Sequence, residues 1–302
     1  MEALKFRKAI LLVSLCLWTL TVFPQVKEDT IFQSDYLLIL NTYTSDAPWS
    51  NAIISPVLQW LNMERKTEVY VENMNMLMID DSLKLADLKT NIFAKYGKKK
   101  PKAVLLLGNS MMLFRNEMRE AWGDVPLILC GEESYMGPDD CYIKKYPVVP
   151  SEQVPLTNFT EEYNLTLLQT RVFIEENVKL LQHMIPGMKK IILIGDGRYV
   201  NQQLNTDMKQ LLQKAYPELE YDFYSAANMT TDSLLLKLNK VDSATTGVLL
   251  SSWFTRQVVA GNVQLQANSF QVISNSVTPI FALKNSLVVN SGMIGGFMYS
   301  QT

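Results

Sequence analysis

Residues 36–62 read YLLILNTYTSDAPWSNAIISPVLQWLN, and their pattern decides how the rest of the chain is interpreted. The unbroken apolar run that opens this stretch predicts a buried strand over residues 36–43. In residues 50–62 the apolar side chains recur at helical spacing, so an amphipathic helix is expected there. The residues between them, 41-NTYTSDAPW-49, are polar and aromatic. They form either a solvated turn or one wall of a binding site at the carboxyl end of the strand.

The same alternation of strand and helix continues as far as residue 131. Strands are expected at 67–73, 103–108 and 125–131. Asp81 or Ser82 is a suitable helix cap, and so is Ser110, and each is followed by apolar side chains at helical spacing. Apolar strands that alternate with helices imply a parallel sheet covered by helices on both faces.

A second lobe follows a segment without periodicity. Residues 132–170 are interrupted by prolines and are interpreted as a crossover that contains no element. Beyond it, helices are expected at 170–184 and 199–215, and strands at 189–196, 219–225, 247–253 and 278–283, with helices between them. The predicted fold class is α/β, with two Rossmann-like lobes of parallel sheets flanked by helices and a cleft between the lobes. Residues 26–150 are assigned to lobe 1, with its sheet from about 36, and residues 151–302 to the crossover and lobe 2.

Composition and charge narrow the function classes. The chain has 302 residues and is 48% hydrophobic, which is enough for a large core. Its 28 basic and 30 acidic residues give a net charge of -2, without the clustered basic excess that nucleic-acid binding requires. The one basic run, 98-KKKPK-102, lies between a helix pattern and a strand pattern and is interpreted as a loop. No nucleic-acid partner is expected.

The N-terminus has the pattern of an export segment. Lys5, Arg7 and Lys8 precede the apolar run 9-AILLVSLCLWTLTVF-23, and polar sequence follows. This run is shorter than the roughly 20 residues of a membrane span. Residues 1–25 are therefore expected to be a signal peptide cleaved near Gln25 or a retained N-terminal anchor. A lipid anchor at Cys16 is the less favoured interpretation. A lipoprotein signal requires a small residue at the position that Leu15 occupies.

Export gives the two remaining cysteines a meaning. In an oxidising compartment Cys130 and Cys141 are candidates for a disulfide. The alternative is that Cys130 is a small buried residue at the end of a strand. With one histidine, His183, and no cluster of cysteine and histidine, no metal site is expected.

Candidate binding residues follow the predicted strands, because ligands of open parallel sheets bind beyond the carboxyl ends of the strands. The residues beyond the strand ends form the rim of each lobe. Two facing lobes with such rims form a cleft that closes on a small ligand. Two readings stay open: Asn109 and Ser110 also suit a helix cap, and residues 195–197 also suit a tight turn. The predicted ligand-binding residues are Asn41, Tyr43, Trp49, Asn109, Ser110, Glu132, Asp196, Tyr199, Trp253 and Lys284.

The sequence patterns of common catalytic and nucleotide-binding sites are missing. Residues 193-LIGDGRYV-200 contain neither a dinucleotide fingerprint nor a P-loop, and no nucleophile elbow occurs in the chain. No enzymatic activity and no cofactor are therefore expected for these residues.

The order of these pieces resembles the type I periplasmic binding fold, in particular the substrate-binding-protein-like extracytoplasmic sensor domains of bacterial histidine kinases. The resemblance covers about residues 36–300. It is carried by 37-LLILNTYTSDAPWSNAI-53, 101-PKAVLLLGNSMMLFRNE-117, 125-VPLILCGEE-133, 185-IPGMKKIILIGDG-197 and 279-PIFALKNSLVVNSGMIGGFMYS-300. It implies a cleft site at the positions equivalent to Tyr43, Trp49, Asn109, Ser110, Glu132, Asp196 and Trp253. The family continues past the Gly-Gly segment, so a longer parent chain is expected.

The expected function is the small-ligand-binding sensor region of a membrane-bound two-component histidine kinase, which signals by lobe closure. Its expected partners are a small-molecule ligand, the membrane through a flanking span, kinase modules in the same parent chain, and a second copy in a homodimer. The expected location is the periplasm or cell envelope. The alternatives are the solute-binding component of an ABC transporter and a secreted enzyme with a site across the cleft.

Overall fold

The structure is a computed structural model that describes residues 36–64, 67–259, 262–284 and 295–298. The predicted export segment, residues 1–25, lies outside the described residues. Within the described ranges, no helix combines the length and the apolar character that crossing a bilayer requires.

The first lobe is built on a five-stranded sheet with the strand order β2-β1-β3-β4-β7. Every strand pair in it is parallel. The strands are β1 (Tyr36–Asn41), β2 (Glu68–Asn73), β3 (Ala103–Leu107), β4 (Leu127–Gly131) and β7 (Leu165–Gln169). The helices are α2 (Pro48–Glu64), α3 (Ser82–Tyr96) and α4 (Arg115–Trp122), with the 3-10 helices η1 (Met76–Met78) and η2 (Asn109–Phe114).

The two faces of the first sheet bury alternate residues of the same strands. Ile39 of β1 packs with Ile54 of α2 in one apolar cluster. Tyr36 points to the opposite face, because it is an odd number of residues away from Ile39, and its ring stacks on Tyr96 of α3 at 6.2 Å. Helix α3 begins where the sequence predicts, since the Asp81 side chain accepts a hydrogen bond from the backbone N–H of Lys84 at 2.8 Å.

The turn after β3 differs from the prediction. Ser110 does not cap an α-helix; it lies inside η2, whose N-cap is Gly108. Gly108 has φ of 95°, and a Cβ there would lie 2.6 Å from the Thr42 hydroxyl oxygen, so glycine is required by both conformation and space. The tight 3-10 turn places Asn109 and Ser110 directly beyond the strand.

The expectation that residues 132–170 contain no element is wrong. This segment holds β5 (Tyr135–Met136), α5 (Asp139–Lys144), β6 (Val154–Pro155), β7 and the 3-10 helices η3 (Pro150–Glu152) and η4 (Leu156–Phe159). β7 pairs with β4 and is the fifth strand of the first sheet, so that sheet extends past residue 150. As an edge strand it leaves Leu168 half exposed, and its short mixed sequence lacks the apolar run of the inner strands.

The second lobe contains a parallel four-stranded sheet with the order β13-β10-β8-β9. Its strands are β8 (Lys190–Gly195), β9 (Glu220–Ser225), β10 (Thr246–Leu250) and the short β13 (Phe281–Ala282). Its helices are α6 (Ile174–Met184), α7 (Tyr199–Ala215), α8 (Thr231–Leu238) and α9 (Ser269–Asn275). Helix α7 occupies the predicted residues 199–215.

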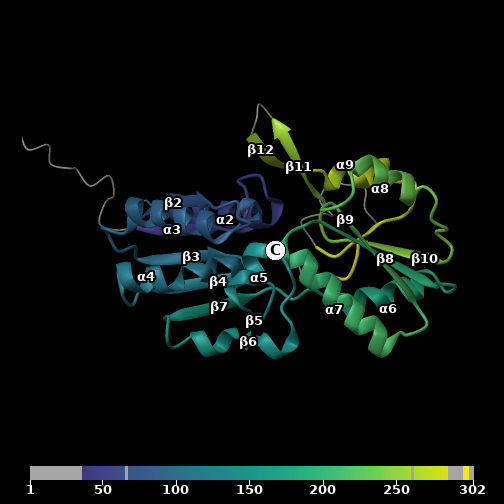
Figure 1. The fold of residues 1–302 in the computed structure, drawn as a ribbon, viewed down its shortest axis with the longest axis horizontal. Helices are drawn as coiled ribbons and strands as arrows, with labels where there is room; N and C mark the ends of the chain where they lie inside the picture. The colour runs from purple at the N-terminus through teal and green to yellow at the C-terminus, as the bar shows by residue number, and fades with distance from the viewer. Residues whose placement is uncertain (1–35, 65–66, 260–261, 285–294, 299–302) are drawn as a thin grey trace, which may run out of the picture. The chain divides into compact units, whose positions relative to one another are not determined.

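Helices cover both faces of this second sheet (Figure 1). Leu193 of β8 packs with side chains of α6 and α7 in one buried cluster. Its neighbours Ile192 and Ile194 pack with side chains of α8 and α9 in another. Strands that are apolar on both sides are thus buried on both sides, which confirms the predicted α/β class with parallel sheets flanked by helices.

A β-hairpin stands where only helices were expected between β10 and β13. It is formed by β11 (Phe254–Val259) and β12 (Asn262–Ala267), which pair antiparallel. The Nη2 atom of Arg256 in β11 donates to the carbonyl oxygen of Leu77 in η1 at 3.3 Å. The hairpin brings Phe254 to the end of β10, where it contributes to the site described below.

Cys130 and Cys141 are both buried free thiols in the structure, so the candidate disulfide is not formed. Cys130 is the penultimate residue of β4 and packs in the apolar cluster under α2. Cys141 lies in α5, beside Tyr146. The structure matches the alternative reading of Cys130 as a buried strand residue, and burial raises the pKa of its thiol to about 11.

Candidate ligand-binding cleft

Two cavities adjoin each other at the carboxyl ends of the two sheets. The larger has a volume of about 180 Å³ and the smaller about 50 Å³. Tyr43, Arg198 and Phe254 line both of them. The larger cavity is also lined by Ala47, Pro48, Trp49, Ser251, Ser252, Ala267, Ser269, Phe270, Ile273 and Lys284. The smaller is also lined by Thr42, Thr44, Asn75, Met76, Leu77, Gly108, Asn109, Ser110, Tyr142, Lys145, Tyr199 and Val200.

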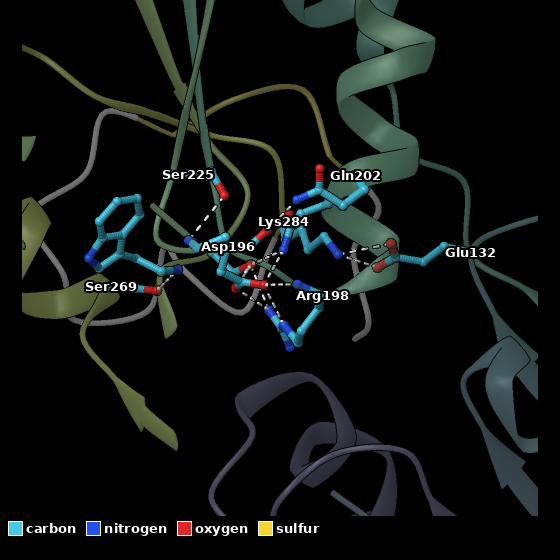
Figure 2. A network of polar contacts seen from close by, with 11 residues as sticks. Glu132, Asp196, Arg198, Gln202, Ser225, Ser269 and Lys284 are labelled. Carbon is cyan, nitrogen blue, oxygen red and sulfur yellow. Dashed lines mark hydrogen bonds and ion pairs between the residues drawn. The ribbon is translucent and has the colours of Figure 1, made fainter. Parts of the chain in front are cut away.

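Arg198 is held at the junction of these cavities by a buried polar network. Asp196 follows β8 and is fully buried. It accepts from Nε of Arg198 at 2.9 Å through Oδ1 and from Nη2 at 2.8 Å through Oδ2. Nη2 also donates to the hydroxyl oxygen of Ser252 at 2.6 Å. Figure 2 shows the Arg198 and Asp196 side chains pointing toward each other. Two parallel bonds fix the plane of the guanidinium.

The network is completed from α7 and from the turn after β10. The Nδ2 atom of Asn201 donates to Asp196 at 2.8 Å and to Ser252 at 2.9 Å. Ser252 in turn donates its hydroxyl proton to Asp196 at 2.8 Å. Burial raises the pKa of Asp196, but the Arg198 charge and these hydrogen bonds outweigh it and bring that pKa below its ordinary value. Asp196 is therefore a buried carboxylate that holds Arg198 in place.

Aromatic rings lie on the guanidinium of Arg198. Its Cζ atom is 4.2 Å from the ring centroid of Phe254 and 5.2 Å from that of Tyr43. Both are within cation–π range. Tyr43 also makes an edge contact with Trp49, with ring centroids 5.6 Å apart. The cation is thus set in an aromatic wall contributed by both lobes.

Hydroxyl and amide groups form the first-lobe side of the smaller cavity. The hydroxyl oxygens of Thr42 and Ser110 lie 2.9 Å apart and are hydrogen-bonded. The Nδ2 atom of Asn109 donates to the carbonyl oxygens of Glu133 at 3.0 Å and Tyr135 at 3.3 Å, which holds the loop after β4. Gly131 gives Asn109 its room, since a Cβ there would lie 1.9 Å from its Oδ1.

An ion pair joins the two rims. Nζ of Lys284 lies 2.6 Å and 2.9 Å from the two carboxylate oxygens of Glu132, and both side chains are largely buried. Figure 2 shows them pointing toward each other. Next to this pair, burial and then the charge of Glu132 raise the pKa of Glu133 to about 7. The carboxyl group of Glu133 therefore binds its proton more strongly than an ordinary glutamate.

Lys145 is a second cation on the smaller cavity. It follows α5 with φ of 63°, and its Nζ donates to the carbonyl oxygens of Tyr142 at 3.1 Å, Ile143 at 2.7 Å and also Ile79. Burial lowers its pKa to about 8. Three carbonyl acceptors match the three N–H donors of an ammonium group, so this lysine is fully used within the protein.

The structure brings most of the predicted residues to the cleft. Tyr43, Asn109, Ser110 and Tyr199 line the smaller cavity, and Tyr43, Trp49 and Lys284 line the larger one. Glu132 lines neither; it lines a separate cavity and reaches the cleft only through its ion pair with Lys284.

Three predicted residues have supporting positions instead of lining positions. Asn41 is fully buried, and its Nδ2 donates to Oδ1 of Asn73 at 2.8 Å. Asp196 supports Arg198. Trp253 is a core residue, fully buried in the cluster under α8 and α9, with Nε1 donating to Thr231 at 3.0 Å. The rim position predicted for Trp253 is corrected to Phe254, because the turn after β10 sends the two aromatic side chains in different directions.

Sequence reasoning did not select Arg198, Phe254, Ser251 or Lys145 as site residues. The sequence does contain a signal for Arg198. An arginine two residues after an aspartate at a strand end is close enough to pair with that aspartate across a tight turn. The Arg198 backbone N–H does donate to Asp196 at 3.0 Å. Ser251 has a positional signal, because it directly follows β10, whereas Lys145 has none, because its position on the cavity depends on tertiary contacts.

The groups in the cleft suit binding. Within the described ranges, no cluster of three or more histidine, cysteine, aspartate or glutamate side chains has the arrangement of a metal site. The cleft offers a fixed cation, aromatic surfaces and hydroxyl groups, which are the kinds of group that line small-molecule sites.

Comparison with solved structures agrees with the architecture. No protein-family model and no curated protein matches the sequence. A structure described as the ABC domain in complex with L-Trp from Streptococcus pneumoniae has a TM-score of 0.50 at 13% identity, covering 85% of this chain and 76% of that one. A LacI-type transcriptional regulator from Bacteroides fragilis has a TM-score of 0.50 at 9% identity, covering 84% and 78%. The chain has the α/β fold of type I periplasmic-binding-protein-like proteins.

Proposed function

We propose that this chain is the extracytoplasmic small-ligand-binding region of a membrane-bound two-component histidine kinase. The observation that carries the binding part is the cleft itself: Arg198 is fixed between the rings of Tyr43 and Phe254, where both sheets end. The N-terminal export pattern supports the location. The resemblance of the strand ends to sensor domains supports the kinase assignment.

Ligand binding would act by favouring one arrangement of the lobes. Both lobes contribute to the walls of each cavity, so a ligand there contacts both at once. A ligand shifts an equilibrium between open and closed forms only as far as its affinity for the two forms differs. The ion pair of Glu132 with Lys284 belongs to the closed form in this scheme, because it also joins the lobes.

The alternative is the solute-binding component of an ABC transporter, which the same cleft supports equally well. The two assignments differ in what the gene encodes after residue 302. A membrane span followed by kinase modules supports the sensor. A stop codon soon after one further helix and strand, beside transporter genes, supports the transporter component.

A thermal-shift screen of small metabolites tests the binding function. At least one compound is expected to raise the midpoint of thermal unfolding, because a ligand that binds the folded state stabilises it. The rise should disappear in Tyr43→Ala. Tyr163→Ala is the matched control, since Tyr163 also has an arginine over its ring, at 5.6 Å, but lines neither cleft cavity. A rise that survives in Tyr43→Ala, or no rise with any compound, would count against the cleft.

A further inference from the structure

The charged side chains that line the cleft are all cations. Among the described lining residues, the larger cavity has Arg198 and Lys284, the smaller has Arg198 and Lys145, and neither has a carboxylate. The counter-charges of the first two lie behind the wall: Asp196 is fully buried, and Glu132 lines a different cavity. A ligand in the cleft therefore faces positive groups, and an anionic group is favoured there.

Among the described residues, Arg198 keeps the most open hydrogen-bond donors of these cations: the two N–H groups of its Nη1, against one N–H of Lys284 and none of Lys145. Lys145 donates to three carbonyl oxygens, and Lys284 is bonded to both oxygens of Glu132. In Arg198, Nε and Nη2 are occupied by Asp196 and Ser252. Among the described residues nothing accepts from its Nη1. Nη1 carries two N–H groups that lie in the plane of the guanidinium. Carboxylate oxygens are the acceptors that fit this geometry best.

A buried hydroxyl group in the wall also needs a partner. Ser251 lines the larger cavity and is only 1% exposed, yet its Oγ has no hydrogen-bond partner among the described residues. A buried polar atom without a partner is unfavourable, so a ligand oxygen at this position would gain a hydrogen bond that the protein lacks. Ser251 and Arg198 line the same cavity.

The remaining walls favour a flat apolar body. Tyr43, Trp49, Phe254, Phe270 and Ile273 face the larger cavity. Its volume of about 180 Å³ exceeds the roughly 150 Å³ of an apolar protein cavity that accepts benzene. One six-membered ring with a small substituent therefore fits.

The hydroxyl groups of Ser252 and Ser269 in the larger cavity already have hydrogen-bond partners within the protein, which leaves only that of Tyr43 beside Ser251 among the described lining residues and disfavours a sugar. Ser252 donates to Asp196 and accepts from Arg198. Ser269 accepts from the backbone N–H of Trp253 at 2.8 Å. A ligand with many hydroxyl groups would leave several of them without partners against aromatic walls.

We propose that the cleft binds a small aromatic monocarboxylate, whose ring lies between Tyr43, Trp49 and Phe270 and whose carboxylate accepts from Arg198 Nη1 and Ser251. The inference rests on the proposed function, because it names the ligand class of the same site. The substituents that the ring carries beyond the carboxylate are those that the smaller cavity admits.

Titration calorimetry of the full chain with three probes tests the ligand class. Benzoate is expected to bind. Benzyl alcohol, which has the ring without the charge, should bind at least tenfold more weakly, and cyclohexanecarboxylate, which has the charge without the flat ring, should bind several-fold more weakly. Equal affinity for benzoate and benzyl alcohol would overturn the assignment of an anion, and equal affinity for the two carboxylates would overturn the assignment of an aromatic ring.

Variants connect the affinity to the named groups. Ser251→Ala is expected to weaken benzoate binding about tenfold while leaving folding intact, since its hydroxyl group has no partner to lose. Arg198→Gln should abolish binding, with Arg119→Gln as the exposed control. Phe270→Ala should weaken binding, whereas Leu236→Ala, equally exposed and outside the cavity, should not. If Arg198→Gln does not fold, an unchanged affinity in Ser251→Ala overturns the proposal.

The results separate this inference from the proposed function. If a screened metabolite binds and loses its binding in Tyr43→Ala while benzoate does not bind, the ligand class is wrong and the cleft function stands. If neither benzoate nor any metabolite binds in a way that depends on Tyr43, both fail.

Discussion

The rims of the two sheets differ in how their polar groups are balanced. In the second lobe, a guanidinium, an amide N–H and a hydroxyl group all donate to the buried carboxylate of Asp196, and one nitrogen of Arg198 stays open among the described residues. In the first lobe, the described side chains beyond β1 and β3 that line the cavities are uncharged, and Thr42 pairs with Ser110. In the function proposed above, the second rim therefore recognises charge and both rims shape the wall.

The largest effect on stability is expected when the cation of the second rim is removed. Arg198→Met leaves Asp196 buried without its charge partner, and losing one member of a buried pair costs about 3–5 kcal/mol. We expect a loss of that order in the free energy of unfolding, measured by urea denaturation. Arg119→Met is the matched control, because its pair with Glu162 is exposed and worth about 1 kcal/mol or less.

A loss below about 1 kcal/mol in Arg198→Met would mean that Asp196 finds another way to be neutralised. The buried pair of Asp196 and Arg198 would then contribute no more to stability than an exposed ion pair, and the two rims would not differ in this respect.

The pH dependence of stability tests the first rim, through the carboxyl group of Glu133. Burial, the Glu132 charge and Asp207 raise the pKa of Glu133 to about 7 from an ordinary 4.5, and the charge of Lys284 opposes them. The folded state therefore holds a proton that the unfolded state has released between these values, so stability falls as pH rises from about 4.5 to about 7. The full effect is on the order of 3 kcal/mol at most.

Urea denaturation at several pH values measures this slope, and Glu133→Gln should flatten it because the amide does not titrate. A variant with the same slope as the wild-type protein would show that Glu133 is ionised normally in the folded state. The burial of Glu133 in the first rim would then not destabilise the folded state.

The smallest effect is expected at the uncharged pair of the first rim. Ser110→Ala removes the hydrogen bond to Thr42, and the Thr42 hydroxyl group remains open to the cavity, where water reaches it. A loss of about 1 kcal/mol or less is expected in the same denaturation experiment. A loss above about 2 kcal/mol would show that this pair is a structural element of the rim and not a replaceable part of its wall.

Much of the fold follows from the sequence because buried parallel strands and amphipathic helices have strong periodic patterns. Helix α7 occupies the predicted residues 199–215, bounded by Arg198 before it and Tyr216 after it. Edge elements are harder to predict. β7 reads LTLLQ and is half exposed, so neither an apolar run nor a clean alternation marks it. The hairpin of β11 and β12 was missed: polar and apolar residues alternate in β12, NVQLQA, but not in β11, FTRQVV.

The residues near the candidate cleft were predicted better than the side chains that line it, and Trp49 and Trp253 show why. Both are aromatic residues shortly after a strand. Trp49 lines the larger cavity, whereas Trp253 is a core residue and its neighbour Phe254 takes the rim. The direction of a side chain after a strand depends on the geometry of the turn, which a single sequence does not determine. The same limit applies to Ser251, whose missing partner is a tertiary property.

A crystal structure of the chain with its tightest small-molecule binder tests the central claim most directly. The account predicts electron density for the ligand in the larger cavity, with an acceptor oxygen within hydrogen-bonding distance of Arg198 Nη1 and an apolar body against Tyr43. A ligand bound elsewhere, or one in the cleft that leaves Nη1 without an acceptor, would contradict it.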